Sequence, residues 1–290
     1  MSDPPPTPEE FTHFRISGSG DSAMAALSVL QFRYDYYRRL NFDFWLRRIQ
    51  RLRGRRDLKT RALRFDAIIE LYTSFLQLLE ILFINTLIAW NEPSDFPALL
   101  TITNKQLQKA IEQHLLSDRT QQWLLDVFMF GRTPDAQPPD YQQRVVENKH
   151  LLKQLVELYL RDYELLNSYK HGFRLSAFDG SRVKAGGETL FSFDSGVTYF
   201  TRARKLDTIV QTTISFNYDH IRHLCIYAYV LLRNIRNGLL LSSRPVHNGA
   251  FNVHQFRITD FAAFANSAIT SRHNRIAYQN PVPTPTPQRK

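Results

Sequence analysis

Residues 151–175, LLKQLVELYLRDYELLNSYKHGFRL, predict a mostly buried helix that ends where the chain changes its pattern. Apolar side chains cover most of the helix circumference. One line of polar side chains runs through them at steps of three or four residues, which places them on one face. This line consists of Glu157, Arg161, Glu164, Asn167 and His171. After Gly172 the apolar residues alternate as in a β-strand. The stretch therefore predicts a junction between a helical region and a β-rich region.

The polar line has two interpretations. A histidine at the C-terminal end of a helix can exchange a proton near neutral pH, and an arginine and an amide beside it can contact an anion. On this interpretation His171, Arg161 and Asn167 are candidate catalytic residues. The alternative is a structural network that fixes the helix register or anchors the strands, with its polar groups mutually satisfied. The sequence leaves both interpretations open.

The remaining periodicities predict a mainly α-helical protein. Helical patterns cover residues 21–53, 60–90, 104–116, 119–130, 141–171 and 217–238. Thr103 is the expected N-cap of one of these helices. Alternation at about 173–215, with turns expected at 179–180, 186–187 and 194–196, predicts a small antiparallel β-meander. We expect a single domain, 21–270, in which a bundle of long helices carries this meander before its last long helix.

The two ends of the chain have a different composition. Residues 1–20 and 271–290 are rich in proline and small polar residues, so we expect both to be disordered tails. The single cysteine, Cys225, excludes an intrachain disulfide and favours the cytoplasm. The beginning of the chain lacks the charge and apolar pattern of a signal peptide. Polar residues such as Glu70 and Glu80 interrupt segment 60–90, which therefore predicts a core helix rather than a membrane span.

Positive charge is concentrated in one short segment. Residues 47–64 hold nine basic residues and one acidic residue, and so carry eight of the ten net positive charges of the chain. Such a segment suits a phosphate backbone, an anionic lipid surface or an acidic partner. The alternative is a solvated corner between two helices, since charge runs commonly only face water.

An aromatic stretch precedes the basic segment. It contains Tyr34, Tyr36, Tyr37, Phe42, Phe44 and Trp45. Aromatic rings beside arginines can stack nucleobases. The other interpretation is a stripe that faces the core, with arginine stems lying along it.

Two further clusters lie in segment 217–238. Residues 233–238, RNIRNG, place Arg233 and Asn237 one turn apart, which suits phosphate and sugar contacts or, alternatively, a solvated helix end. His220 and His223 have a spacing that can bind a metal, but no matching carboxylate accompanies them. We therefore predict neither a metal nor a cofactor.

Two of these fragments resemble a known superfamily. Residues 163–174, YELLNSYKHGFR, resemble the N-x-x-K-H-G helix end of some bacterial all-α proteins of the HEPN or abortive-infection-like kind. The RNIRNG fragment resembles the start of their Arg-polar-His motif. The resemblance implies a bundle of four to five helices that dimerises. It also implies a metal-independent RNase site, in which His acts on the ribose 2′-hydroxyl and Arg stabilises the phosphorane.

The spacing of this chain departs from that motif. The positions where a His would follow Arg233 hold Gly238, Leu239 and Leu240, and His171 follows Arg161 at a longer distance. The resemblance then implies either a degenerate motif or a His supplied by another helix.

From these patterns we expect an RNA- or nucleotide-associated protein in defence or stress response, either a metal-independent RNase or a degenerate relative. The candidate catalytic residues are His171, Arg161, Asn167 and Arg233, and the candidate nucleic-acid-binding residues are Arg47, Arg48, Arg51, Arg55, Arg56, Lys59, Arg236 and Asn237. The rival hypothesis is a non-catalytic helical interaction protein that binds an acidic partner or a membrane surface.

Overall fold

The computed structural model describes residues 13–15, 26–52, 58–116, 141–170, 175–185, 187–202, 208–242 and 271–279. The chain forms two compact units, each assembled from three separate segments. The first unit contains Met1–Arg47, Leu78–Leu160 and Cys225–Thr259, and the second contains Arg48–Gln77, Arg161–Leu224 and Asp260–Lys290. The described part is mostly helical and includes a small antiparallel sheet, as the sequence predicts.

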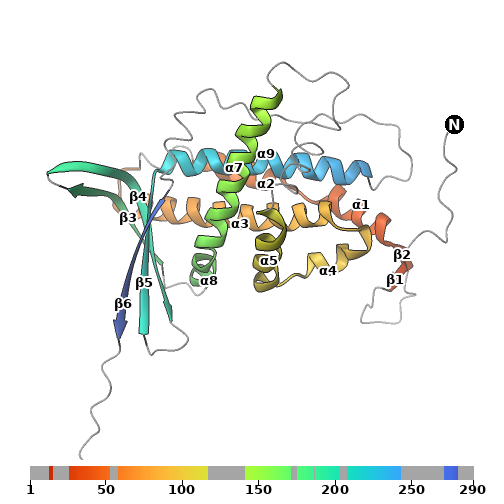
Figure 1. Cartoon of the computed structure of the whole chain (residues 1–290), viewed down its shortest axis with the longest axis horizontal. Helices are drawn as coiled ribbons and strands as arrows, with labels where there is room; N and C mark the ends of the chain where they lie inside the picture. Colours follow the sequence, from red (N-terminus) through yellow and green to blue (C-terminus); the bar gives the residue numbers. More distant parts are fainter. Residues whose placement is uncertain are drawn as a thin grey trace, which may run out of the picture. The chain divides into compact units, whose positions relative to one another are not determined.

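The helices and strands follow one another along the chain as labelled in Figure 1. The helices are α1 (Val29–Arg39), α2 (Asp43–Arg51), α3 (Arg61–Trp90), α4 (Phe96–Leu100), α5 (Asn104–Ala110), α7 (Tyr141–Asp162), α8 (Glu164–Lys170) and α9 (Tyr218–Ser242). A 3-10 turn, η3 (Pro93–Asp95), precedes α4, and a π-helical turn, η4 (Ile111–Leu115), follows α5. The strands are β1 (His13–Arg15), β2 (Ala26–Ser28), β3 (Leu175–Ala185), β4 (Glu188–Arg202), β5 (Thr208–Phe216) and β6 (Ser271–Gln279).

Aromatic rings fill the core of the first unit around α1 and α4. Phe96 of α4 is 1% exposed, and its ring meets those of Phe32, Tyr36 and Tyr37 at centroid distances of 5.5, 5.5 and 6.0 Å. Edge-on aromatic contacts of this kind add to the stabilisation from burial. The Tyr37 hydroxyl donates to Oδ1 of Asn85 at 2.6 Å, so its polar tip is satisfied inside the core.

The predicted cap of the short helix α5 is confirmed. The Thr103 side chain accepts a hydrogen bond from the Gln106 backbone N–H at 3.4 Å. The Gln106 side chain in turn accepts from the Thr103 backbone N–H at 3.0 Å. This reciprocal pair is a capping box, which satisfies two of the donors that a helix start leaves open.

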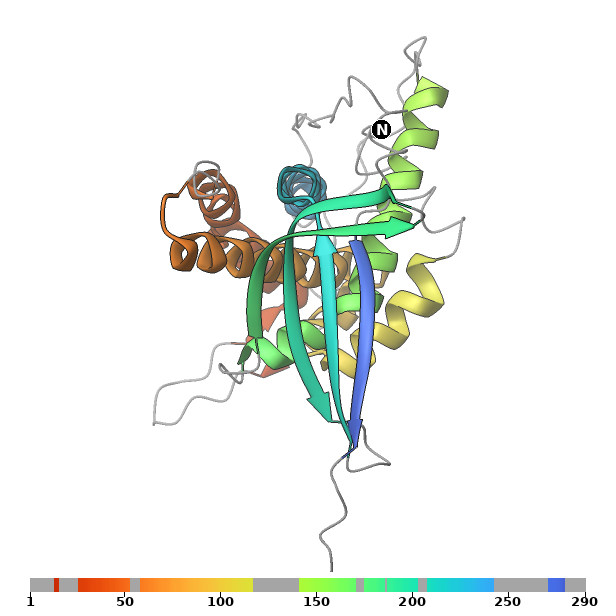
Figure 2. The same ribbon diagram turned by 90° about the vertical axis from the view of Figure 1, so that its left-hand side faces the viewer.

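The second unit contains a four-stranded antiparallel sheet in the order β3-β4-β5-β6 (Figure 2). The β3–β4 hairpin bends before its tip, and its register shifts between Val183 and Lys184. Such bulges bend a strand and increase its twist. Helix α8 packs against β4, and the Ser168 hydroxyl donates to the Phe200 carbonyl oxygen at 3.3 Å. The Tyr72 ring of α3 stacks on the Phe216 ring of β5 at 4.5 Å.

The predicted helix over residues 21–53 is wrong in its extent. Residues 26–28 form β2, and the helical part is divided into α1 and α2 by Leu40–Phe42. At this break the Phe42 backbone N–H bonds to the Leu40 carbonyl oxygen at 3.2 Å, and the Trp45 N–H bonds to the Phe42 carbonyl oxygen at 3.1 Å. A tight turn thus replaces the regular ladder, although both flanking segments keep helical periodicity.

The predicted single helix over residues 141–171 is also wrong, because Tyr163 separates α7 from α8. Beyond the break the Leu166 N–H bonds to the Tyr163 carbonyl oxygen at 3.0 Å. Glu164 begins α8, where a negative charge is favoured by the helix dipole. Because the helix is interrupted, the described part of the polar line, with Glu157 and Arg161 on α7 and Glu164 and Asn167 on α8, does not follow one continuous helix.

The predicted β-region at about 173–215 is confirmed, but its strands are longer than expected. Residues 179–180 lie inside β3 and residues 194–196 lie inside β4, so neither forms the predicted turn. Gly187, with φ of 89°, lies between β3 and β4 as expected. Residues 271–279 form the edge strand β6 instead of joining a disordered tail. This segment, SRHNRIAYQ, lies ahead of the proline-rich end, and its backbone pairs with β5.

Helix α3 is, within the described residues, long and apolar enough to cross a membrane. Its most apolar window has 67% of its residues buried inside the structure. A core helix of a soluble protein passes the same test, so the prediction of a core helix stays a prediction.

Candidate nucleic-acid interface

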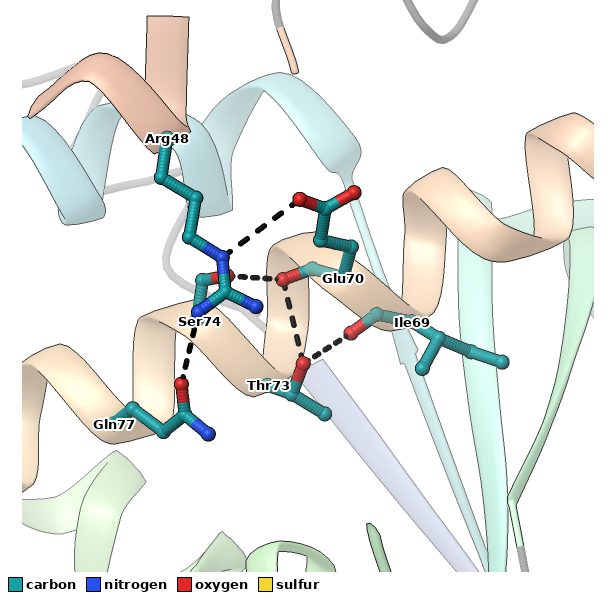
Figure 3. A network of polar contacts seen from close by, with 6 residues as sticks. All are labelled: Arg48, Ile69, Glu70, Thr73, Ser74 and Gln77. Carbon is teal, nitrogen blue, oxygen red and sulfur yellow. Dashed lines mark hydrogen bonds and ion pairs between the residues drawn. The ribbon is translucent and has the colours of Figure 1, made fainter. Parts of the chain in front are cut away.

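Arg48, in the predicted basic segment, is held by α3. Its Nη1 donates to Oε1 of Gln77 at 3.1 Å, and its Nε lies 3.7 Å from Oε1 of Glu70 (Figure 3). The Thr73 and Ser74 hydroxyls of the same helix turn back to the carbonyl oxygens of α3. Arg48 therefore connects α2 to α3, and its charge is paired with Glu70 of the same protein.

Arg64 is also engaged within the second unit. Its Nε donates to Oδ2 of Asp179 in β3 at 3.1 Å, and its Nη1 donates to the Leu58 and Lys59 carbonyl oxygens at 3.0 and 3.3 Å. These bonds close the chain just before α3 and fasten this helix to the sheet. Arg48 and Arg64, two arginines of the basic segment, thus stabilise the fold through internal hydrogen bonds. Their positions in the sequence do not predict these bonds.

Three other cations of the basic segment in the second unit face water. Arg51, Lys59 and Arg61 are all exposed. The Arg61 guanidinium lies over the Phe65 ring at 4.9 Å, which is a cation–π contact. Exposed arginine and lysine side chains can contact phosphate oxygens. Arg47 is likewise exposed and belongs to the first unit, while Arg55 and Arg56 lie outside the described residues.

Arg161, a candidate catalytic residue, binds its neighbour in sequence. Its Nε and Nη2 donate to the two carboxylate oxygens of Asp162 at 3.0 and 3.1 Å. Burial of the guanidinium lowers the pKa of Arg161, but the hydrogen bond and charge of Asp162 raise it by more, and the net shift is upward. The Tyr72 hydroxyl also donates to Asp162, which is fully buried. Arg161 is therefore the counter-ion of a buried carboxylate.

The partners expected for Arg161 are described only in part. The Asn167 backbone lies in α8, its side chain lies outside the described residues, and so does all of His171. Glu157 is exposed on α7 in the first unit, and Glu164 is half-buried in the second. The meeting of His171, Asn167 and Arg161 at one site stays a prediction.

The RNIRNG fragment lies in α9 in the first unit. Arg233 is exposed, while Arg236 and Asn237 are half-buried. The Arg236 Nε donates to the Tyr37 carbonyl oxygen at 3.2 Å, and its guanidinium lies over the Phe42 ring at 5.6 Å. Arg236, predicted to bind nucleic acid, is thus occupied with the end of α1, and Arg233 is the arginine of this fragment that faces solvent.

Most of the aromatic stretch faces inward. Tyr37 and Phe42 are buried, and Tyr34, Tyr36 and Trp45 are half-buried. Phe44 differs, because 49% of it is exposed. The core-facing interpretation therefore applies to the buried rings, and Phe44 is the member available for stacking.

His220 and His223, whose spacing in the sequence can bind a metal, lie on α9 in the second unit. Burial and the neighbouring His223 lower the pKa of His220 to about 4, which keeps His220 neutral at physiological pH. No group of three or more His, Cys, Asp or Glu side chains within the described residues is arranged to hold a metal ion.

Sequence reasoning missed two polar pairs that organise the units. Asp43 accepts from the Tyr229 hydroxyl at 2.6 Å in the first unit, and Asp162 accepts from Tyr72 in the second. Their partners are 186 and 90 residues away in the sequence. The available signal was the position of each tyrosine on an apolar helix face, which calls for a partner for its hydroxyl.

No protein-family model, curated protein or solved structure matches this chain.

Proposed function

We propose that this chain is an RNA- or nucleotide-associated protein of the HEPN-like kind, built on a bundle of long helices. One observation carries the proposal. Arg48 and Arg64 fix the ends of the basic segment by internal bonds, while Arg51, Lys59 and Arg61 between them are exposed. Cations that face solvent suit a surface that contacts the phosphate groups of a nucleic acid whatever its base sequence.

The engagement of Arg161 favours a degenerate relative over an active RNase. A guanidinium that neutralises buried Asp162 is poorly placed to stabilise a phosphorane as well, because losing it would leave a buried charge uncompensated. On this proposal Arg233 and His171 remain the candidates for any metal-independent cleavage. A homodimer in the cytoplasm, acting in defence or stress response, remains part of the proposal.

The rival proposal, a non-catalytic protein that binds an acidic partner or a membrane surface, uses the same exposed cations. It is favoured by the number of arginines committed to structural bonds, namely Arg48, Arg64, Arg161 and Arg236. RNA binding and anionic-vesicle binding by the same purified protein distinguish the two proposals.

The binding test measures RNA affinity at several salt concentrations. The variant Arg51→Gln/Lys59→Gln/Arg61→Gln removes three exposed cations, and Lys105→Gln/Lys109→Gln/Lys153→Gln removes three exposed cations elsewhere. For a single-stranded RNA, we expect the first variant to reduce the slope of log affinity against log salt by about 2. We expect the control variant to leave the slope unchanged. Equal slopes for wild type and both variants, or an affinity that does not depend on salt, would reject the proposal.

The cleavage test separates the active from the degenerate form. RNA is incubated with wild type, His171→Ala and Arg233→Gln in the presence of a chelator. Loss of cleavage in both variants supports a metal-independent RNase. Equal cleavage by all three proteins rejects His171 and Arg233 as catalytic residues. Binding without cleavage by the wild type supports the degenerate relative.

A further inference from the structure

The corner between α1 and α2, residues 38–47 of the first unit, has an exposed surface of unusual composition. The exposed side chains of this corner are those of Arg38, Arg39, Asn41, Asp43, Phe44 and Arg47. Three of them are arginines, and Phe44 is a large apolar residue with 49% of its surface in water. This corner is distinct from the cations of the second unit described above.

Two hydrogen bonds and one cation–π contact hold the corner against α9. The Tyr229 hydroxyl donates to Oδ1 of Asp43 at 2.6 Å, and the Arg236 Nε donates to the Tyr37 carbonyl oxygen at 3.2 Å. The Arg236 guanidinium also lies over the buried Phe42 ring at 5.6 Å. Three exposed arginines outnumber the one exposed carboxylate, Asp43, so positive charge dominates the outer surface of the corner. The backbone that carries them is fixed before any ligand arrives, which reduces the cost of ordering on binding.

The residues around Phe44 leave its ring accessible to solvent. Its ring meets Trp45 edge-on, at a centroid distance of 5.3 Å and an interplanar angle of 76°. An edge contact of this kind supports a ring without covering both of its faces. Arg47 follows Phe44 by three residues on the same helix, so the two side chains are neighbours on its surface.

We propose that the α1–α2 corner binds single-stranded nucleic acid, with a base stacked on Phe44 and the adjoining phosphates contacted by Arg38, Arg39 and Arg47. This inference rests on the proposed function, since it specifies the form of RNA that the protein binds. Aromatic stacking tolerates any base because every base has a π-face, and arginines beside the ring follow the backbone.

Single strands fit this surface better than a duplex or a membrane. The bases of a duplex are stacked on each other, so an exposed ring finds no free base face there. A helix that lies on a membrane needs a broad apolar face toward the lipid. Of the apolar residues around Phe44, Phe42 and Ile49 are buried and Trp45 and Leu46 are half-buried, so Phe44 is the exposed large apolar side chain of this corner and no broad apolar face is available.

The test compares Phe44→Ala with Leu63→Ala. Leu63 is a matched control, because it is 48% exposed on α3 in the second unit. Fluorescence anisotropy measures the binding of a labelled 12-nucleotide oligouridine and of a labelled RNA duplex of equal length. Binding to anionic vesicles that contain phosphatidylserine is measured separately. We expect Phe44→Ala to weaken oligouridine binding by about 5- to 100-fold, from the usual contribution of one stacked base. We expect Phe44→Trp and Leu63→Ala to bind like the wild type, and duplex binding to be unchanged by Phe44→Ala.

Each outcome has one meaning. If the wild type binds RNA with salt dependence but Phe44→Ala binds oligouridine equally well, the inference is wrong and the proposed function stands. If Phe44→Ala loses vesicle binding and keeps oligouridine binding, the corner is a membrane contact and the inference is overturned. If the wild type binds neither RNA, the proposed function fails, and the inference fails with it. Circular dichroism of each variant confirms that its helices are intact.

Discussion

The Tyr72 hydroxyl donates a hydrogen bond to Asp162, a carboxylate with 0% exposure. The same carboxylate accepts two hydrogen bonds from the Arg161 guanidinium. A buried charge is tolerated only when it is paired and hydrogen-bonded. The three side chains therefore form a hydrogen-bonded cluster, which joins α3 to the end of α7 within the second unit.

Substitutions of Asp162 and Tyr72 measure what this cluster contributes to stability. We expect Asp162→Ala to lower the free energy of unfolding by about 2–3 kcal/mol, because the buried Tyr72 hydroxyl and the Arg161 guanidinium both lose their hydrogen bonds to this carboxylate. We expect Tyr72→Phe to cost about 1–2 kcal/mol, since the carboxylate keeps its arginine. Urea unfolding monitored by circular dichroism gives both values. An Asp162→Ala variant as stable as the wild type would show that the buried carboxylate has no structural role.

Gly196 of β4 is required by the Phe178 ring of β3. A Cβ atom at position 196 would lie 1.9 Å from Cζ of Phe178, so the ring would have to move. Phe178 is half-buried, and its ring can swing out at the cost of its packing. We expect Gly196→Ala to lower the free energy of unfolding by about 1–3 kcal/mol.

A double-mutant cycle tests this explanation. Phe178→Ala removes the ring, so Gly196→Ala should cost much less in that background than in the wild type. Equal costs in the two backgrounds would mean that something other than the ring excludes a side chain at position 196.

The sequence predicted the elements better than their ends. The periodicity of residues 60–90 gave α3 almost to the residue, and Thr103 marked the start of α5 because its capping box is a local signal. The breaks at 40–42 and at Tyr163 were missed, since residues on both sides keep helical periodicity. Strand β6 was missed because it is formed by pairing with β5, which is distant in sequence.

The same distinction applies to the candidate site. Sequence located the basic segment, and the structure divides it into arginines bound to the protein, such as Arg48 and Arg64, and cations that face water. That division depends on Gln77 and Asp179, partners on other elements that local pattern does not identify. Likewise, six aromatic residues looked equivalent in sequence, and only burial distinguishes Phe44.

Two buried tyrosines of the first unit allow a matched comparison of hydrogen-bond loss. The Tyr37 hydroxyl bonds to Asn85, which is 3% exposed, and the Tyr229 hydroxyl bonds to Asp43, which is exposed. Burial, with the hydrogen bond and charge of Asp43, raises the pKa of Tyr229 to about 12, so its phenol stays a donor at neutral pH.

We expect Tyr37→Phe to cost about 1–3 kcal/mol, because Asn85 loses its partner away from water. We expect Tyr229→Phe to cost about 0.5–1 kcal/mol, because water can replace the phenol at Asp43. Both values come from urea unfolding of single variants. A larger loss for Tyr229→Phe would indicate that fastening the α1–α2 corner matters more to stability than the buried bond.

His220 makes the free energy of unfolding depend on pH in the acidic range. It lies in the first turn of α9 with Asp219, Arg222 and His223 beside it, and burial followed by the charge of His223 lowers its pKa from 6.5 to about 4. Between these two values the unfolded chain binds a proton at His220 that the folded chain does not bind. The free energy of unfolding therefore rises with pH across this window and falls as the solution is acidified.

We expect His220 to cost the wild type about 2 kcal/mol of stability between pH 7.5 and pH 5, and the variant His220→Gln to lack this component. The difference between the two proteins isolates His220 from the carboxylates, which titrate in both. His114→Gln serves as the control for the loss of a histidine, because His114 is exposed and lies in η4 of the first unit, away from His220 in the sequence. Urea unfolding at both pH values measures each component. If wild type and His220→Gln lose the same stability on acidification, His220 accepts its proton as readily in the folded protein as in the unfolded chain.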